Sequence, residues 1–340
     1  IIREEIDAQM ETRAINYFLN ATGGLAEFDR AFTADATDTL SYLAWLGAMP
    51  KSTDFEDPAQ YQAALGVWQS QKPKMTTDAG RDYEKTIGEW LTARKNRDKI
   101  IISTKGGHPR LESMDISRLS RDEIFDDFEH SLINLNTDYI DIYWLHKDDP
   151  NIPPERLIEI MNEILDTGKA KYIAVSNWGY DRIRAANDYA KSNGLKPFIA
   201  GQIQYSVGKP NPEFVDKLIY TMDDAEYQKY AADTLNVFAF SSQSKGFFAM
   251  LDSIGEDKIP QAVKDEFLNA HNLELYNRLK EMSKEKNVSI SALMLSALTS
   301  DDNVNTFVQI GPRKIEYLTD SMSAKDLRLT PDERGYLMKF

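Results

Sequence analysis

Short apolar runs alternate with amphipathic segments over most of the chain from about residue 85 onward. The apolar runs are rich in Ile, Val, Tyr and Phe, which is typical of strands covered on both faces of a parallel sheet. The segments between them have the apolar spacing of helices. The predicted strands are 99–105, 139–145, 171–176, 198–205, 236–241 and 305–311. The predicted helices are 85–94, 120–135, 153–167, 180–192 and a long helical stretch over 260–298.

Repeated strand–helix units of this kind predict an α/β fold, either a closed (β/α)8 barrel or a doubly wound sheet. No Gly-x-Gly-x-x-Gly follows any predicted strand, so the sequence favours the barrel. The first 80 residues are less regular, and we expect a TIM barrel over 39–340 as a single domain, preceded by a helical and hairpin extension over 1–38. Two further predicted strands, 40–49 and 74–79, bring the number to eight, and a helix is expected at 58–71 between them. A helix at 4–19 and a hairpin at 27–40 are expected before them.

Composition narrows the possible functions. The 340 residues carry a net charge of −14, which disfavours a nucleic-acid partner, since phosphate backbones are bound by clustered Lys and Arg. There is no cysteine, which excludes thiol catalysis and disulfides. No apolar run approaches the roughly 20 residues of a membrane span, and the first residues do not resemble a signal peptide. We therefore expect a cytoplasmic protein without a membrane partner.

Polar residues follow the predicted strands. The carboxyl ends of parallel strands meet at one rim, where barrel active sites are assembled. His146 ends an apolar strand, and this position alone fits either a functional histidine or one that caps a strand. His108 is either a substrate contact or a surface-loop histidine. No pair of histidines has metal-ligand spacing. The rim candidates are Asp78, Lys105, His146, Ser176, Asn177, Gln202, Ser241, Ser242 and 311–314.

Five ordered segments resemble the aldo-keto reductase family. The resemblance is strong over about residues 84–335 and weak before them. The segments are LTARKNRDKIIISTK (91–105), the strand 139–146 that ends in His146, GKAKYIAVSNW (168–178), FAFSSQSKGF (238–247), and IGPRK (310–314) followed by Asp320 and Ser321.

The resemblance implies reversible hydride transfer between NADPH and a carbonyl. In this family a tyrosine supplies the proton, a lysine paired with an aspartate supports it, and a histidine orients the carbonyl. Lys105 and His146 match the lysine and the histidine. Asp78 and Tyr83 have the family's five-residue spacing for the aspartate and the tyrosine, although the glycine-rich loop that follows the family's tyrosine is absent. Tyr61 after Glu56, and Asp29 with Phe32, could take these places instead, and Tyr83 also fits an ordinary residue at the N-terminus of a helix.

The resemblance also implies a cofactor site. Ser176, Asn177 and Gln202 would bind the nicotinamide carboxamide, and Phe240 would stack on the ring in place of the usual tyrosine. A glycine permits close approach of the backbone to the pyrophosphate, and a basic pair suits a 2′-phosphate, which favours NADPH. The residues implied at the pyrophosphate and the adenosine phosphate are Ser241, Gln243, Lys245, Gly246, Gly311, Arg313, Lys314, Asp320 and Ser321.

The predicted function is NADPH-dependent reduction of an aldehyde, ketone or sugar-like carbonyl, with the reverse oxidation of an alcohol. The alternative is a degenerate barrel that binds NADPH as a sensing or scaffolding module with little turnover. We expect substrate specificity to lie in the irregular segments 49–57, 108–113 and 206–223. The sequence does not indicate an oligomeric state.

Overall fold

The computed structural model describes residues 79–110, 113–215, 217–312 and 314–338, and these fall into two compact units. One unit holds the described residues before Ile102 together with His130–Asp138, and the other holds most of the rest. Each unit is described by itself. The early elements expected before residue 79 lie outside the described residues, as does the boundary between the extension and the barrel.

In the first unit, helix α4 (Ala79–Arg94) begins earlier than the sequence predicts, so Ala79 is helical and does not end a strand. The helix packs closely on the segment around Asn134. A Cβ added to Gly88 would lie 2.4 Å from the Asn134 carbonyl oxygen, so only glycine allows this approach. Asn134 Nδ2 also donates to Glu84 Oε2 at 3.0 Å.

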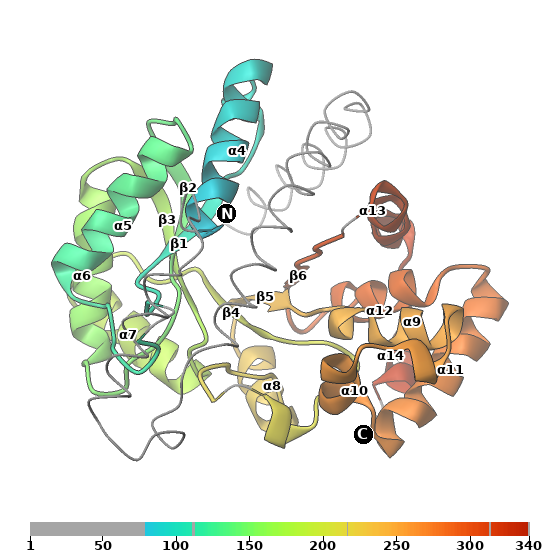
Figure 1. Cartoon of the computed structure of the whole chain (residues 1–340). Helices are drawn as coiled ribbons and strands as arrows, with labels where there is room; N and C mark the ends of the chain where they lie inside the picture. The colour runs from blue at the N-terminus through green and yellow to red at the C-terminus, as the bar shows by residue number, and fades with distance from the viewer. Residues whose placement is uncertain (1–78, 111–112, 216, 313, 339–340) are drawn as a thin grey trace, which may run out of the picture. The chain divides into compact units, whose positions relative to one another are not determined.

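The second unit is built on a parallel sheet whose order is β1-β2-β3-β4-β5-β6. Each strand is followed along the chain by one or more helices (Figure 1). The strands are β1 (Ser103–Gly106), β2 (Ile140–Leu145), β3 (Ala170–Ser176), β4 (Ala200–Gln204), β5 (Asn236–Phe240) and β6 (Thr306–Val308). All six predicted strands are present, each within or beside its expected range.

The remaining helices connect and cover these strands. Helices α6 and α7 lie side by side, and α6 packs on β3 (Figure 1). The helices are α5 (Arg121–Asn134), α6 (Pro154–Asp166), α7 (Tyr180–Ser192), α8 (Asp224–Ala231), α9 (Phe247–Ser253), α10 (Gln261–Phe267), α11 (Ala270–Lys286), α12 (Ile290–Thr299), α13 (Ile315–Met322) and α14 (Pro331–Leu337).

The single helical stretch expected over 260–298 is wrong in detail, because the structure divides it into α10, α11 and α12. The Asn269 side chain accepts a hydrogen bond from the backbone N–H of Asn272 and so begins α11. Asn287 has a φ of 54°, a left-handed conformation that ends this helix. Ser289 then caps α12 by accepting from the N–H of Ala292.

Aromatic rings fill the concave side of the sheet. The Trp144 ring on β2 lies 4.9 Å from the Phe238 ring on β5, although these strands are not neighbours in the sheet. Phe238 in turn stacks on Phe307 of β6 at 4.8 Å. The sheet therefore curls around a packed interior, as in a (β/α)8 barrel, and the described residues supply six of its strands.

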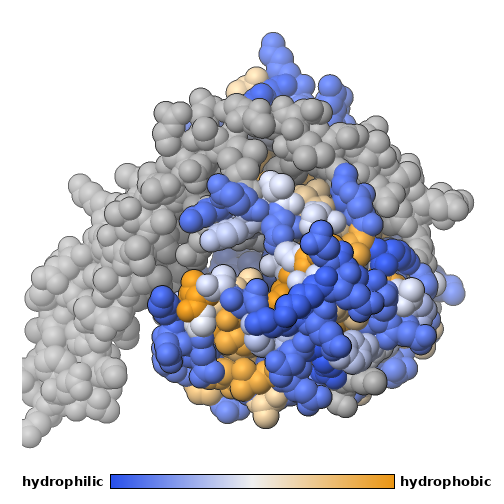
Figure 2. Space-filling view, turned by 90° about the vertical axis from the view of Figure 1, so that its right-hand side faces the viewer, coloured by the Kyte–Doolittle hydropathy of each residue, from blue (hydrophilic) through white to orange (hydrophobic). Residues whose placement is uncertain are grey.

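On the face of the molecule drawn in Figure 2, the described residues present many charged and polar side chains. Figure 2 shows a face that is mostly hydrophilic, with smaller hydrophobic patches between the polar groups. Among the helices that the structure describes, none is long and apolar enough to cross a membrane.

Candidate active site

Lys105 and His146 come from adjacent strand ends. Lys105 is the third residue of β1, and His146 directly follows β2 and donates its backbone N–H to the Gly106 carbonyl at 2.9 Å. Burial lowers the pKa of the Lys105 ammonium. Burial, and then the charge of Lys105, lower the pKa of His146 to about 3. His146 is therefore a neutral imidazole beside a cation, which suits an N–H donor to a carbonyl oxygen.

Asn177 joins two parts of the rim. It follows β3 with a φ of 61°, and its Nδ2 donates to the His146 carbonyl oxygen at 3.2 Å. Its Oδ1 accepts the backbone N–H of Tyr220 at 3.3 Å. Nearby, the Lys147 ammonium donates to the Leu218 carbonyl at 3.0 Å. The segment around Leu218–Tyr220 is thus fixed to the residues that follow β2 and β3.

The Gln202 amide carries a buried donor that finds no partner in the described part of the chain. Its Oε1 accepts a hydrogen bond from Ser176 Oγ at 3.2 Å, and Ser176 Oγ accepts from Asn177 Nδ2 at the same distance. Gln202 Nε2 is buried and has no hydrogen-bond partner among the residues that the structure describes. An orphaned buried amide costs about 1–3 kcal/mol. A bound carbonyl oxygen, such as that of a carboxamide, would satisfy it, so these three residues fit the nicotinamide end of the expected cofactor.

The loop after β5 has an unusual backbone. Ser241, Ser244, Lys245 and Gly246 all have positive φ angles, between 49° and 81°. The N–H groups of Ser244 and Gly246 donate to the Ser241 and Gln243 carbonyls at 2.8 and 2.9 Å, so the loop is a series of tight turns. Successive backbone N–H groups in such turns can form a concave surface that suits an anion. This loop therefore fits the expected pyrophosphate contact.

Side chains of the same loop reach distant parts of the chain. Gln243 Nε2 donates to Ser321 Oγ at 3.1 Å, which brings two of the expected cofactor residues together. The Lys245 ammonium is ion-paired with the buried Glu266 carboxylate on α10, which also accepts from Gln204 Nε2 at 3.0 Å. Sequence reasoning missed Glu266, since nothing in the pattern of α10 separates it from an exposed helical glutamate.

The remaining residues expected at the cofactor are less closely grouped. Phe240 ends β5 and is half-buried, and its carbonyl accepts the N–H of Tyr205 at 3.2 Å. Gly311 and Lys314 are exposed, with the Lys314 ammonium 5.6 Å from the Tyr317 ring centre. Asp320 is half-buried. Arg313 lies outside the described residues.

The expected proton donor belongs to the other unit. Tyr83 lies on α4 and is 45% exposed, and Asp78 lies outside the described residues. Also outside them are Asp29, Phe32, Glu56 and Tyr61. The assignment of Asp78 and Tyr83 remains a prediction. No group of three or more histidine or carboxylate side chains able to hold a metal ion occurs among the residues that the structure describes.

The acidic residues that follow His146 are fixed by partners. Arg182 on α7 pairs with Asp148 at 2.8 Å and also donates to the Asp149 carbonyl at 2.9 Å. Asp149 Oδ1 accepts from the backbone N–H of Asn151 at 3.0 Å. These contacts give both carboxylates a role in holding the loop after β2.

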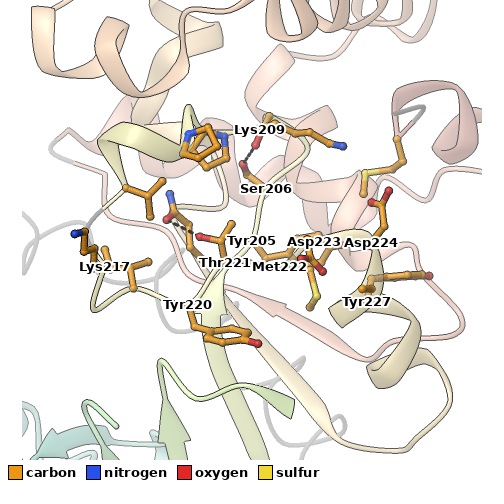
Figure 3. Close-up of a pocket in the computed structure, with 18 of the residues that line it drawn as sticks. Tyr205, Ser206, Lys209, Lys217, Tyr220, Thr221, Met222, Asp223, Asp224 and Tyr227 are labelled. Atoms are coloured by element: carbon orange, nitrogen blue, oxygen red, sulfur yellow. Dashed lines mark hydrogen bonds between the residues drawn. The ribbon is translucent and has the colours of Figure 1, made fainter. Parts of the chain in front are cut away.

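A cavity of about 750 Å³ lies beside the end of β4 (Figure 3). Most of its wall belongs to segment 206–223, which the sequence predicts to confer specificity. Gln204, Tyr205 and Tyr227 contribute polar and aromatic groups, and α14 and the residue after it contribute Arg334 and Met338. Exposed hydrophobic side chains also gather on this segment, namely Phe214, Leu218 and Tyr220. The apolar side chains of segment 206–223 are suited to contact with an organic molecule.

Known proteins resemble this chain over most of the described part. The family model described as "Aldo/keto reductase family" matches residues 75–340. An aryl-alcohol dehydrogenase of Pestalotiopsis microspora is 27% identical over 76% of this chain, and norsolorinic acid reductase A of Aspergillus parasiticus is 26% identical over 75%. This chain covers 67% and 63% of the length of those two relatives.

A solved structure shares the fold. The crystal structure of a thermostable aldo-keto reductase in complex with the inhibitor epalrestat has a TM-score of 0.57 and 20% sequence identity, covering 83% of this chain and 88% of its own. This agrees with the barrel predicted from the alternation of strands and helices. The match of the family model to more than three quarters of the sequence shows that this chain belongs to the aldo/keto reductase family.

Proposed function

We propose that this protein is an NADP-dependent oxidoreductase that reduces an aldehyde or ketone and reversibly oxidises the corresponding alcohol. The observation that carries the proposal is the meeting of two kinds of group at one rim. A neutral His146 lies beside the Lys105 cation. Gln202 lies on β4 beside Ser176 and Asn177, and its Nε2 has no partner among the described residues. Lys105 and His146 are suited to bind the carbonyl oxygen of a substrate. Ser176, Asn177 and Gln202 are suited to bind the carboxamide of a nicotinamide.

NADPH, when bound, supplies the hydride for the carbonyl carbon. The side chains of Ser176, Asn177 and Gln202 would hold its carboxamide. The loop Ser241–Gly246 would bind its pyrophosphate. The Lys245 ammonium would leave the Glu266 carboxylate and form an ion pair with a phosphate of the cofactor. Arg313, Lys314, Asp320 and Ser321 remain the proposed residues at the adenosine phosphate, with Gly311 beside them.

The protein residues control the proton and the orientation of the substrate. His146, kept neutral by its surroundings, donates an N–H to the carbonyl oxygen and fixes its direction. A tyrosine phenol with an ordinary pKa near 10 becomes a better acid next to an ammonium, and Lys105 provides one. We propose Tyr83 as this acid, with Asp78 as the partner of Lys105.

Substitution of Tyr83 by Phe tests this assignment. A general acid contributes roughly 10²–10⁴-fold to turnover, so Tyr83→Phe should lower the rate of aldehyde reduction by that factor. The affinity for NADPH, measured by quenching of tryptophan fluorescence, should stay nearly unchanged. Tyr61→Phe is the matched control at the second candidate tyrosine and should retain activity. Equal turnover in Tyr83→Phe and the parent protein would show that Tyr83 is not the acid.

A second candidate function is a module that binds NADPH without turnover. One observation favours it: Tyr83 lies within a regular helix and is 45% exposed. In the family, by contrast, a glycine-rich loop follows the tyrosine. NADPH binding with no reduction of any reactive aldehyde would support this second function.

A further inference from the structure

Residues after β1 bring a second imidazole to the active-site histidine. The ring centres of His108 and His146 lie 4.5 Å apart, with the ring planes inclined at 63°. His108 is half-buried. Burial and then the charge of Lys105 are the main causes of the lowered pKa of His146. The resemblance to the family assigns a role to His146 only.

The position of His108 is fixed by an ion pair behind it. Gly107 turns the chain with a φ of 74°, and its N–H donates to Asp127 Oδ2 at 2.8 Å. Arg118 forms two hydrogen bonds with the Asp127 carboxylate, at 2.8 and 3.2 Å. Arg118 Nη1 also donates to the His108 carbonyl at 3.0 Å. A two-point Arg–carboxylate pair is among the more rigid polar contacts in proteins, so the His108 backbone is held firmly.

The hydrogen bonding of the His108 ring defines what it offers to a ligand. Its Nδ1 lies 2.6 Å from the Pro109 carbonyl oxygen, and because a carbonyl only accepts, Nδ1 carries the hydrogen. In the neutral ring Nε2 is then an acceptor. The two rings therefore differ in chemistry, since His146 is assigned an N–H donor role toward a carbonyl oxygen and His108 presents a lone pair.

We infer that His108 is a specificity-determining residue that binds a hydroxyl group on the carbon next to the reacting carbonyl. This inference rests on the proposed function. Rings 4.5 Å apart place nitrogens close enough for one small molecule to contact both through hydrogen bonds of about 2.9 Å. The preferred substrates are then α-hydroxy aldehydes or ketones, whose carbonyl oxygen accepts from His146 and whose hydroxyl donates to His108.

The test compares lactaldehyde with propanal, which has the same carbon chain without the hydroxyl. A site built to bind a hydroxyl discriminates strongly against the analogue that lacks it. We expect the ratio of kcat/KM for lactaldehyde over propanal to fall at least about tenfold in His108→Leu. Comparing this ratio between proteins cancels the different intrinsic reactivities of the two aldehydes. His108→Gln, which keeps a polar acceptor, should retain a larger share of the preference.

A measurement on the unaltered protein guards against a variant that does not fold. Propylene glycol, with adjacent hydroxyls, should inhibit propanal reduction more strongly than trimethylene glycol, whose hydroxyls are one carbon further apart. Equal inhibition, or an unchanged aldehyde ratio in a folded His108→Leu, would overturn the role of His108 while leaving the proposed function intact. Absence of NADPH-dependent reduction of every aldehyde would overturn the proposed function, and this inference with it.

Discussion

His146 is the residue on which the proposed chemistry depends most, and its charge state is the first property to establish. Burial is the main reason that its pKa is lowered to about 3, and the neighbouring Lys105 cation is the second. A histidine with an ordinary pKa near 6.5 would be half-charged in mildly acidic solution. The same residue in the folded protein stays neutral there.

We predict that the His146 imidazole does not titrate in the folded protein between about pH 7.5 and 4.5. Carbon-13 NMR of labelled histidines would follow its ring, and His146→Gln would assign the signal by its loss. Between its folded and unfolded pKa values the unfolded chain binds a proton that the folded chain does not. This contribution to folding stability is therefore complete above about pH 6.5 and is lost as the pH falls toward 3. A midpoint near pH 6 in the folded protein would contradict this account.

Residues at strand ends were the easiest to predict, because buried strands are visible in the sequence and their ends share one rim. Ser176, Asn177 and Gln202 do lie together there. The contacts of Lys245 with Glu266 and of His108 with His146 were not predictable. They depend on how loops fold between elements that are far apart in the sequence.

At the scale of single elements, β1 is held by very close packing. A Cβ on Gly106 would lie 2.0 Å from the Tyr143 hydroxyl oxygen and 2.9 Å from the Asp127 Cβ. Tyr143 is fully buried and donates to the Ile124 carbonyl, so its ring has little room to move. The end of the strand that carries Lys105 therefore requires glycine at this position.

Gly106→Ala should destabilise the protein by about 1–3 kcal/mol, which is usual for overpacking in a core. Urea denaturation would measure the change. Gly335→Ala is the matched control. Among the described residues, no atom beyond its chain neighbours and its own helix backbone lies within 4 Å of its added Cβ, and the residue is within helix α14. Alanine there should be neutral or stabilising, by up to about 1 kcal/mol. Equal stability of the two variants would contradict the close packing at β1.

Some element boundaries were predictable because their signals are local. Ser120 with Glu123 three residues later is a local sequence signal for a helix start, and at the start of α5 the two residues exchange side chain to backbone hydrogen bonds as a capping box. The division of 260–298 into three helices was not predicted. Its breaks depend on Asn and Ser caps rather than on Gly or Pro, and these residues also occur inside helices.

For the whole molecule, the alternation of strand and helix was enough to predict the fold class. Parallel strands that are covered on both faces have continuous apolar sequences. Six such strands are present in the described sheet, in the same order as in the chain. The strands expected before residue 79 lie outside the described residues, as does Asp78. The chemistry is therefore supported most firmly where strand ends and family motifs coincide, at Lys105, His146 and Gln202.

The central claim is that this barrel transfers a hydride from NADPH to a carbonyl carbon. The most direct measurement uses NADPH with deuterium at both C4 positions of the nicotinamide and analyses the product alcohol by mass spectrometry. The account predicts one deuterium per molecule of alcohol, with the rate of alcohol formation strongly reduced in Lys105→Met. Alcohol without deuterium, or no alcohol from any aldehyde at saturating NADPH, would contradict it.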